Sequence, residues 1–178
     1  MTPEETINKF LRDVVDLILS SPGFTIKAKQ DGAPRPTGSY ADIDFVTDTG
    51  LGWEEFNSVD RIADEDIDVT SKGMRQIMMS VGFYRDLSVD NARKVHIGIV
   101  RESIRELFGL AGLGLTRRSE VREISETLET SWEERAQLDI FLSSVSTDVD
   151  IVRSIASIDI AGEFQARGLS YAFNIGVQ

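Results

Sequence analysis

The segment at residues 131–152, SWEERAQLDIFLSSVSTDVDIV, constrains the fold more strongly than any other part of the chain. From Leu138 onward, apolar and polar residues alternate with the period of two that is typical of a β-strand with one buried face. Strands in globular proteins are usually about five or six residues long, and this alternation runs much further. We expect two long strands, at residues 135–149 and 152–164, that form a hairpin with its tip near residues 147–150.

The N-terminal residues predict a helix with a well-defined start. Thr2 can cap the helix, Pro3 suits its first position, and Glu5 completes a capping box. Apolar residues then recur at helical spacing across residues 7–18, and the sequence SPG at residues 21–23 ends the pattern. The chain therefore opens with an amphipathic helix.

A second helix is expected at residues 88–108. Ser88 can serve as its N-cap, Asp90 favours its first turn, and Gly109 suits the position just past its end. Further strands are predicted at residues 24–30, 40–47, 53–59, 74–84 and 169–177, with turns at residues 48–50 and 71–73. Most connections are too short for a parallel crossover. The sequence therefore predicts an α+β fold, with a mostly antiparallel sheet of about five or six strands, two main helices packed on it and a long β-hairpin near the C-terminus.

Length and composition narrow the class of protein. A chain of 178 residues without a clear linker is expected to form a single domain over residues 1–178. No stretch approaches the roughly 18 apolar residues of a membrane span, and the acidic N-terminus lacks an export signal, so we expect no membrane partner. The absence of cysteine excludes disulfides and thiolate metal sites. The net charge of −11 argues against generic DNA binding, which needs a basic surface.

Two features that resemble binding sites have plainer structural explanations. The glycine-rich sequence GLAGLGLT at residues 109–116 follows a helix, whereas a phosphate-binding loop precedes one. We interpret it as a helix C-cap followed by an irregular segment, with a short helical turn near Arg118 and a strand at residues 121–124. His96 is the single histidine and has no second ligand at metal-binding spacing, so we interpret it as a partly buried structural residue.

Acidic residues occur in pairs two positions apart at Asp42/Asp44, Asp66/Asp68 and Asp148/Asp150. On a strand, this spacing places both carboxylates on one face, where oxygen ligands can hold Mg²⁺ or Ca²⁺. A metal-dependent hydrolase that uses Asp66, Asp68 and Lys72 is therefore an open alternative. Solvated strand faces explain such pairs more simply. The sequence contains no nucleophile motif, so we expect no enzyme and no cofactor.

Three packing patterns follow one another along the chain. A Pro-rich turn leads into an aromatic strand (APRPTGSYADIDFV), and a strand passes through a glycine-aromatic step into a polar-capped helix (MRQIMMSVGFYRDLSVDNARKVHIGIV). An Arg-Ala-x-Leu-Asp strand (ERAQLDIFLSSV) precedes a second long strand (DIVRSIASIDI). These patterns, preceded by the N-terminal helix, resemble the phage neck or tail-terminator family of contractile-tailed viruses and prophages. The resemblance covers roughly residues 1–162.

The resemblance implies a structural virion protein without enzymatic activity. Such a protein would form a homo-oligomeric ring, expected to be a hexamer, that caps the tail tube and joins it to the head-side connector. The tail sheath would be a further partner, and genomic DNA would pass through without specific binding. The protein would be assembled in the host cytoplasm and reside in the neck or tail. Another ring protein of the neck or tube, and a module that binds a peptide along a sheet edge, are the alternatives.

The contacts between subunits are expected at two places. The first is the Pro-rich loop at residues 31–39, where the candidates are Arg35, Pro36 and Tyr40. The second is the expected hairpin tip, where the candidates are Thr147, Asp148 and Asp150. The alternatives are a plain surface turn at the loop and, at the long strands, two core strands without any projection.

Overall fold

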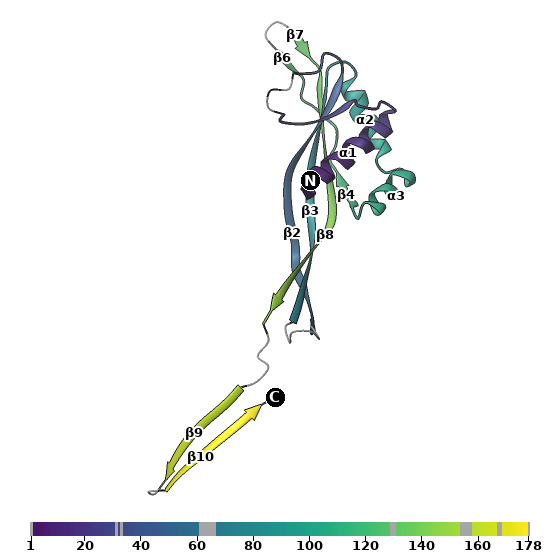
Figure 1. Ribbon diagram of the computed structural model, residues 1–178. Helices are drawn as coiled ribbons and strands as arrows, with labels where there is room; N and C mark the ends of the chain where they lie inside the picture. The colour runs from purple at the N-terminus through teal and green to yellow at the C-terminus, as the bar shows by residue number, and fades with distance from the viewer. Residues whose placement is uncertain are drawn as a thin grey trace. The chain divides into compact units, whose positions relative to one another are not determined.

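The computed structural model describes residues 2–30, 32, 34–60, 67–128, 131–153, 158–166 and 169–177. Its helices are α1 (Pro3–Leu19), α2 (Ser88–Gly98) and α3 (Glu102–Leu110). Its strands form one six-stranded sheet and two two-stranded sheets (Figure 1). The predicted α+β fold is therefore confirmed. Within the described residues, no helix is long and apolar enough to cross a membrane.

The six-stranded sheet is mixed but mostly antiparallel. Across the sheet, the strands follow the order β1 (Thr25–Lys27), β2 (Tyr40–Asp60), β3 (Ile67–Tyr84), β8 (Arg135–Val152) and β4 (Gly114–Arg118). The sixth strand, β5 (Arg122–Glu123), also pairs with β8. The strand β1 runs parallel to β2, whereas β4 and β5 run antiparallel to β8. The long strands β3 and β8 each have a neighbouring strand on both sides, so both lie inside the sheet.

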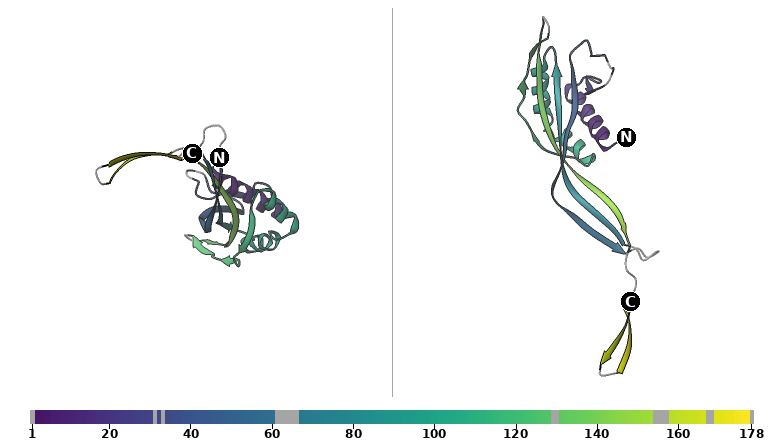
Figure 2. Two further views of the ribbon diagram at one scale, coloured as in Figure 1. Left: turned by 90° about the horizontal axis from the view of Figure 1, so that it is seen from below. Right: turned by 90° about the vertical axis from the view of Figure 1, so that its left-hand side faces the viewer.

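The helices cover one face of this sheet, as Figure 2 shows. Alternate residues of β3 and β8 point into the layer between sheet and helices, and they are fully or almost fully buried: Ile77, Met79, Val81, Phe83, Ala136, Leu138, Ile140 and Leu142. The helices contribute the apolar residues Leu11, Val15, Ala92, Val95, Ile99 and Phe108. Each large side chain buried here contributes about 1.5–3 kcal/mol of transfer free energy.

The predicted N-terminal helix is confirmed in detail. The Thr2 hydroxyl accepts a hydrogen bond from the Glu5 N–H at 3.3 Å, and Glu5 Oε2 accepts one from the Thr2 N–H at 3.1 Å. These two bonds are the reciprocal contacts of a capping box. The local sequence alone therefore determines where α1 begins.

The single helix predicted at residues 88–108 is in fact two helices. A Cβ atom on Gly98 would lie 2.5 Å from Ile18 Cγ2, so the close approach of α1 to the end of α2 requires glycine. Arg101 then adopts an extended backbone, with φ −60° and ψ 144°, before α3 begins. The apolar periodicity continues across this break and therefore does not mark it.

The caps expected for this region were also wrong. Leu87, not Ser88, occupies the N-cap position of α2, and Glu134 Oε1 accepts a hydrogen bond from the Val89 N–H at 3.4 Å. At the end of α3, the left-handed residue is Gly112 (φ 69°) and not Gly109. The N–H of Leu113 reaches back to the Phe108 carbonyl at 2.9 Å, which closes a Schellman motif.

The segment after α3 is more regular than predicted. The interpretation of the glycine-rich sequence as a helix C-cap is confirmed, but β4 starts immediately at Gly114, where an irregular segment was expected. Arg118 belongs to this strand and not to a helical turn. The strands β5 and β6 (Glu126–Leu128) follow, and β6 pairs with β7 (Ser131–Glu133).

The turns predicted inside β2 and β3 do not occur. The strand β2 continues through residues 48–50 for a length of 21 residues, and β3 continues through residues 71–73 for 18 residues. Gly52, with φ 77°, is the one position in β2 with a left-handed backbone among the described residues. Because neighbouring long strands satisfy each other's backbone groups, pairing overrides the local turn preference.

The predicted hairpin of residues 135–149 with 152–164 was wrong in its pairing. The strand β8 continues through residues 147–150 as part of the six-stranded sheet, so no hairpin tip lies there. The C-terminal hairpin instead joins β9 (Ile158–Ala166) to β10 (Leu169–Val177) in antiparallel register. A period of two predicts a strand, but it does not identify the strand that pairs with it.

The chain divides into two compact units. The first contains residues 1–53 and 73–146, and the second contains residues 54–72 and 147–178. The first unit carries the helices and the core, whereas the second carries the far ends of β2, β3 and β8 together with the C-terminal hairpin. The expected single domain over residues 1–178 stays a prediction.

Candidate functional site

The Pro-rich loop before β2 is attached to the sheet through Arg35. Arg35 Nε donates a hydrogen bond to the Tyr40 hydroxyl at 2.7 Å, and Arg35 Nη2 donates to Glu133 Oε2 at 2.9 Å. Tyr40 opens β2 and Glu133 closes β7, so one side chain joins segments 98 residues apart in the sequence. These contacts determine where the loop meets the rest of the first unit.

Glu133 lies at the centre of a cluster that we call the arginine clamp, formed by Arg35, Arg85, Arg135, Glu133, Tyr40 and Tyr84. Its side chain is only 8% exposed, and its carboxylate lies 3.6 Å from Arg85 Nε and 2.6 Å from Arg135 Nη2. Burial alone would raise the pKa of Glu133, but hydrogen bonds from Arg135 and Arg35 outweigh it and hold this pKa below its usual value. Glu133 is therefore a structural anion at neutral pH.

Two tyrosines form the floor of the arginine clamp. The rings of Tyr40 and Tyr84 stack with centroids 4.7 Å apart and an interplanar angle of 9°. The guanidinium carbon of Arg35 lies 5.4 Å from the Tyr84 centroid, and that of Arg135 lies at the same distance. Cation–π contacts of this kind add roughly 0.5–1 kcal/mol each at exposed sites. The clamp thus combines a buried ion pair with stacking.

The acidic pair Asp42/Asp44 lies on one face of β2, as its spacing predicted, but each carboxylate has its own protein partner. Tyr84 donates a hydrogen bond to Asp42 Oδ2 at 3.1 Å, and Lys29 Nζ lies 2.6 Å from Asp44 Oδ2. Burial raises the pKa of Asp42, and burial also raises the pKa of Tyr84. The pair therefore belongs to the structural contacts around the arginine clamp.

The hydrolase alternative gains no support from the structure. Asp66 lies outside the described residues, whereas Asp68 and Lys72 both lie in β3. In the part of the chain that the structure describes, no group of three or more His, Asp or Glu side chains is arranged to hold a metal ion. The third acidic pair, Asp148 and Asp150, lies on the exposed part of β8.

His96 has the structural role that the sequence suggested. It is half-buried in α2, and its Nε2 accepts a hydrogen bond from Arg118 Nε at 2.9 Å. Burial and the neighbouring charge of Arg118 both lower the pKa of His96. A neutral imidazole that accepts from a guanidinium in this way links α2 to β4.

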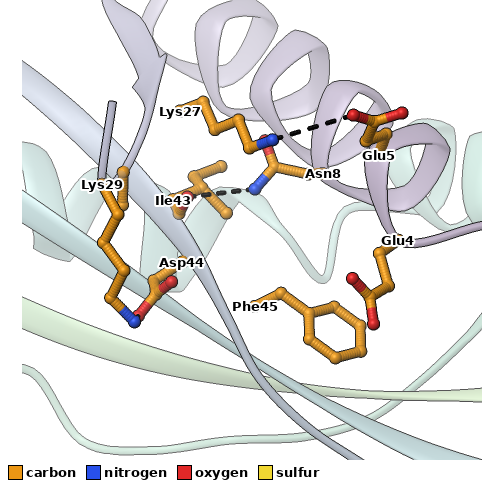
Figure 3. A pocket seen from close by; sticks show the side chains of 9 residues that line it. Glu4, Glu5, Asn8, Lys27, Lys29, Ile43, Asp44 and Phe45 are labelled. Carbon is orange, nitrogen blue, oxygen red and sulfur yellow. Dashed lines mark hydrogen bonds and ion pairs between the residues drawn. The ribbon is translucent and has the colours of Figure 1, made fainter. Parts of the chain in front are cut away.

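A surface pocket of about 280 Å³ lies between the start of α1 and the edge of the sheet (Figure 3). Four of its charged groups form two ion pairs, since Lys27 Nζ lies 3.9 Å from Glu5 Oε1 and Lys29 is paired with Asp44. Asn8 donates a hydrogen bond to the Ile43 carbonyl at 3.0 Å. Figure 3 marks the Lys27–Glu5 and Asn8–Ile43 contacts with dashed lines. The contacts of this pocket join α1 to β1 and β2. The side chains that form them are not arranged as in a catalytic site.

Large apolar side chains are exposed on two of the long strands. On β2 they are Trp53, Phe56 and Val59, and on β8 they are Val145, Val149 and Ile151, with relative exposures from 54% to 99%. Exposed aromatic residues on this scale are typical of surfaces that bind another protein. The period of two in β8 places Val145, Val149 and Ile151 on one face, which is the sequence signal by which these residues could have been found.

The predicted interface residues fall into two groups. In the loop, Pro36 is half-buried, and Tyr40 is only 6% exposed, so Tyr40 would act through Arg35 and not by direct contact. Thr147, Asp148 and Asp150 are all exposed on β8. Their role in an interface stays a prediction.

The chain was compared with models of protein families and with curated proteins. The family model described as phage neck terminator protein matches residues 5–166. A search of curated proteins finds no match to the chain.

Proposed function

This chain belongs to the phage neck terminator protein family, and from that membership we propose that it forms a hexameric ring that caps the tail tube and joins it to the head-side connector. Family membership supports a structural protein of the virion neck. In this proposal the subunits assemble in the host cytoplasm, contact the tube, the connector and the tail sheath of a contractile tail, and catalyse no reaction.

The observation that carries the proposal is the apolar surface of the long strands. Trp53 is 99% exposed and Phe56 is 68% exposed, although both belong to regular strand β2. Leaving such large side chains in water is unfavourable by roughly 1.5–3 kcal/mol each relative to burial. Contact with neighbouring subunits or with the tube would recover this free energy, so a ring accounts for residues that a lone chain leaves uncovered.

The charge of the chain suits a channel for DNA. A sixfold ring would carry a formal charge of 6 × −11 = −66. Carboxylates that face the channel would repel the phosphate backbone and let DNA pass without specific binding. Asp148 and Asp150 are exposed on β8 and are our candidates for this role. Their replacement by asparagine should then slow or reduce DNA ejection through the neck.

A second candidate function within the same class is another ring of the neck or tube. The same exposed strands would suit it, so only the position in the virion separates the two. A module that binds a peptide along a sheet edge would instead remain a monomer until its peptide is added.

The experiment that tests the proposal measures the mass of the purified protein at low and high salt, with and without purified tail tubes. High salt is included because acidic subunits repel one another more strongly at low ionic strength. The proposal predicts a species near six times 19.8 kDa, free or on the tubes, with a ring at one tube end in electron micrographs. A protein that stays monomeric and fails to bind tube ends would contradict it, whereas rings at another position in the virion would favour the second candidate.

A further inference from the structure

The strand β1 covers only three residues of the outer edge of β2. On that side, the Ala41 N–H donates to the Phe24 carbonyl at 3.1 Å. The Ile43 carbonyl accepts from the Ala28 N–H at 3.0 Å, and the chain then turns away at Lys29, whose φ is 56°. Within the described residues, β1 is the one strand that pairs with this side of β2. In the described chain, the outer edge of β2 is therefore open just beyond the end of β1.

Phe45 is the next residue of β2 that directs its backbone groups toward this edge. The backbone groups of successive strand residues point to opposite sides, and those of Ala41 and Ile43 point toward β1. An extended segment that continues the line of β1 would pair with the N–H and C=O of Phe45, as a strand does when it is added to a sheet edge. Every second side chain of this segment would then point to the face of the sheet that carries α1.

The pocket between the start of α1 and this edge contains a buried acceptor without a donor. Asn8 lines the pocket, and Figure 3 shows its side chain reaching from α1 toward Ile43. Asn8 is only 4% exposed, and its Nδ2 donates to the Ile43 carbonyl at 3.0 Å, which fixes the orientation of the amide. Asn8 Oδ1 is also buried and has no hydrogen-bond partner among the described residues. Buried acceptors of this kind are rare in folded proteins because they are costly.

The charges around the pocket favour a positively charged donor. Asp44 is paired with Lys29 at 2.6 Å. Glu5 is paired with Lys27 at the longer distance of 3.9 Å. The carboxylate of Glu4 makes no hydrogen bond or ion pair with the described part of the chain. The lining thus carries three negative and two positive charges, and one further cation would balance it.

We propose that this pocket binds a lysine or arginine side chain of a different protein, whose extended segment pairs with the edge of β2 at Phe45. The cationic group donates to Asn8 Oδ1 and forms an ion pair with Glu4, since both side chains supply N–H donors with a positive charge. A second copy of this chain is a poorer match, because the exposed end of β8 carries Asp148 and Asp150, which Glu4 repels. The inference goes beyond the proposed ring and does not depend on it.

The test measures the binding of fluorescent peptides to the full-length protein by fluorescence anisotropy at low salt. The peptides TVKVT and TVEVT differ only in the charge of the central residue, and both favour an extended backbone. The proposal predicts that TVKVT binds at least about tenfold more tightly than TVEVT, because only its central side chain balances the pocket. A fully N-methylated TVKVT lacks the N–H groups that pair with a strand, so it should lose this binding.

Two variants with the same change in net charge locate the site. Glu4 is exposed, and Glu4→Lys should reverse the preference, so that TVEVT binds more tightly than TVKVT. The matched control is Asp13→Lys, at an exposed position of the same helix about 13 Å further along its axis, and it should keep the preference of the wild type. Hydrogen exchange of the Phe45 amide reports on the edge itself, and TVKVT should slow this exchange whereas TVEVT should not.

Equal binding of the two peptides, or a preference that survives Glu4→Lys, would overturn the proposal. Full binding of the N-methylated peptide, or unchanged exchange at Phe45 with TVKVT bound, would do so as well, because the peptide would then not pair with this edge. Slow exchange at Phe45 in concentrated protein without peptide would assign the edge to a second copy and reject a different protein as the partner. None of these measurements uses ring formation, so the proposed function and this inference can fail separately.

Discussion

The two halves of β8 show how one sequence pattern can serve two different surroundings. In the first half, Leu138 and Ile140 are fully buried against the helices, and Asp139 on the other face accepts a hydrogen bond from Ser80 Oγ at 2.9 Å. In the second half, Val149 and Ile151 also alternate with acidic residues, but the period of two places them on the side of Asp139, opposite Leu138 and Ile140, and they remain more than half exposed. The strand continues without interruption.

The comparison shows which structural features alternation in a sequence predicts and which it does not. Alternation determines that the segment is extended and which residues share a face. It does not determine whether another element covers that face. The helices cover Leu138 and Ile140, and in the proposed ring a neighbouring subunit or the tail tube covers Val149 and Ile151.

The largest expected effect comes from the core half. Leu138→Ala should lower the free energy of unfolding by about 2–5 kcal/mol, because it leaves a cavity in a fully buried site. The matched variant Val149→Ala should lower it by less than about 1 kcal/mol in the monomer, since this side chain is exposed. Chemical denaturation of both variants measures the difference. Equal losses would remove the contrast between the halves.

The arginine clamp should give the next largest effect. Glu133→Gln removes the anion that Arg35, Arg85 and Arg135 share and should lower the free energy of unfolding by about 1–3 kcal/mol. The control is Glu106→Gln, at an exposed position of α3, which should change stability by less than about 0.5 kcal/mol. An unchanged denaturation midpoint in Glu133→Gln would show that the clamp contributes nothing to stability.

The clamp also predicts a pH dependence. The pKa of Glu133 is lower in the folded than in the unfolded chain, so the unfolded chain binds more protons as the pH falls. The stabilisation from Glu133 should therefore be complete above its ordinary pKa of 4.5 and be lost as the pH drops through the folded value. Unfolding curves of wild type and Glu133→Gln, recorded between neutral and acidic pH, should converge at low pH. A constant difference would refute this assignment.

The smallest expected effect is a shift in the fluorescence of Trp53. In the variant Trp132→Phe, Trp53 is the only tryptophan, and it is 99% exposed in the single chain. Its fluorescence should shift to shorter wavelength when rings form on tail tubes, because assembly removes it from water. The free variant should emit at the long wavelength of a solvated indole. An emission that does not change during assembly would exclude Trp53 from the contacts.

The parts of the fold that the sequence could predict are those that depend on near neighbours. The capping box of Thr2 and Glu5, the helical stripe of α1 and the alternation in β8 all lie within short stretches. The break after Gly98 was missed because the apolar periodicity of α2 continues into α3. The pairing of β8 was missed because alternation is the same for every possible partner strand.

In the candidate site, too, the sequence could predict only features that depend on near neighbours in the chain. Arg35 could be singled out because prolines flank it, but its partner Glu133 is 98 residues away and has no local signature. The apolar alternation at the end of β8 was detectable in the sequence, and Val149 and Ile151 are exposed because they lie on the face opposite the buried residues Leu138 and Ile140. The sequence predicted strands at residues 152–164 and 169–177, yet only the structure shows that β9 pairs with β10.

Hydrogen exchange along β8 tests the central claim most directly. The measurement compares the backbone amides of residues 136–142 and 147–152 in the free protein and in protein bound to tail tubes. We predict slow exchange of the first segment in both states, and slow exchange of the second segment only in the assembled state. Exchange of residues 147–152 that is unchanged by assembly would contradict the proposal that assembly covers this half of the strand.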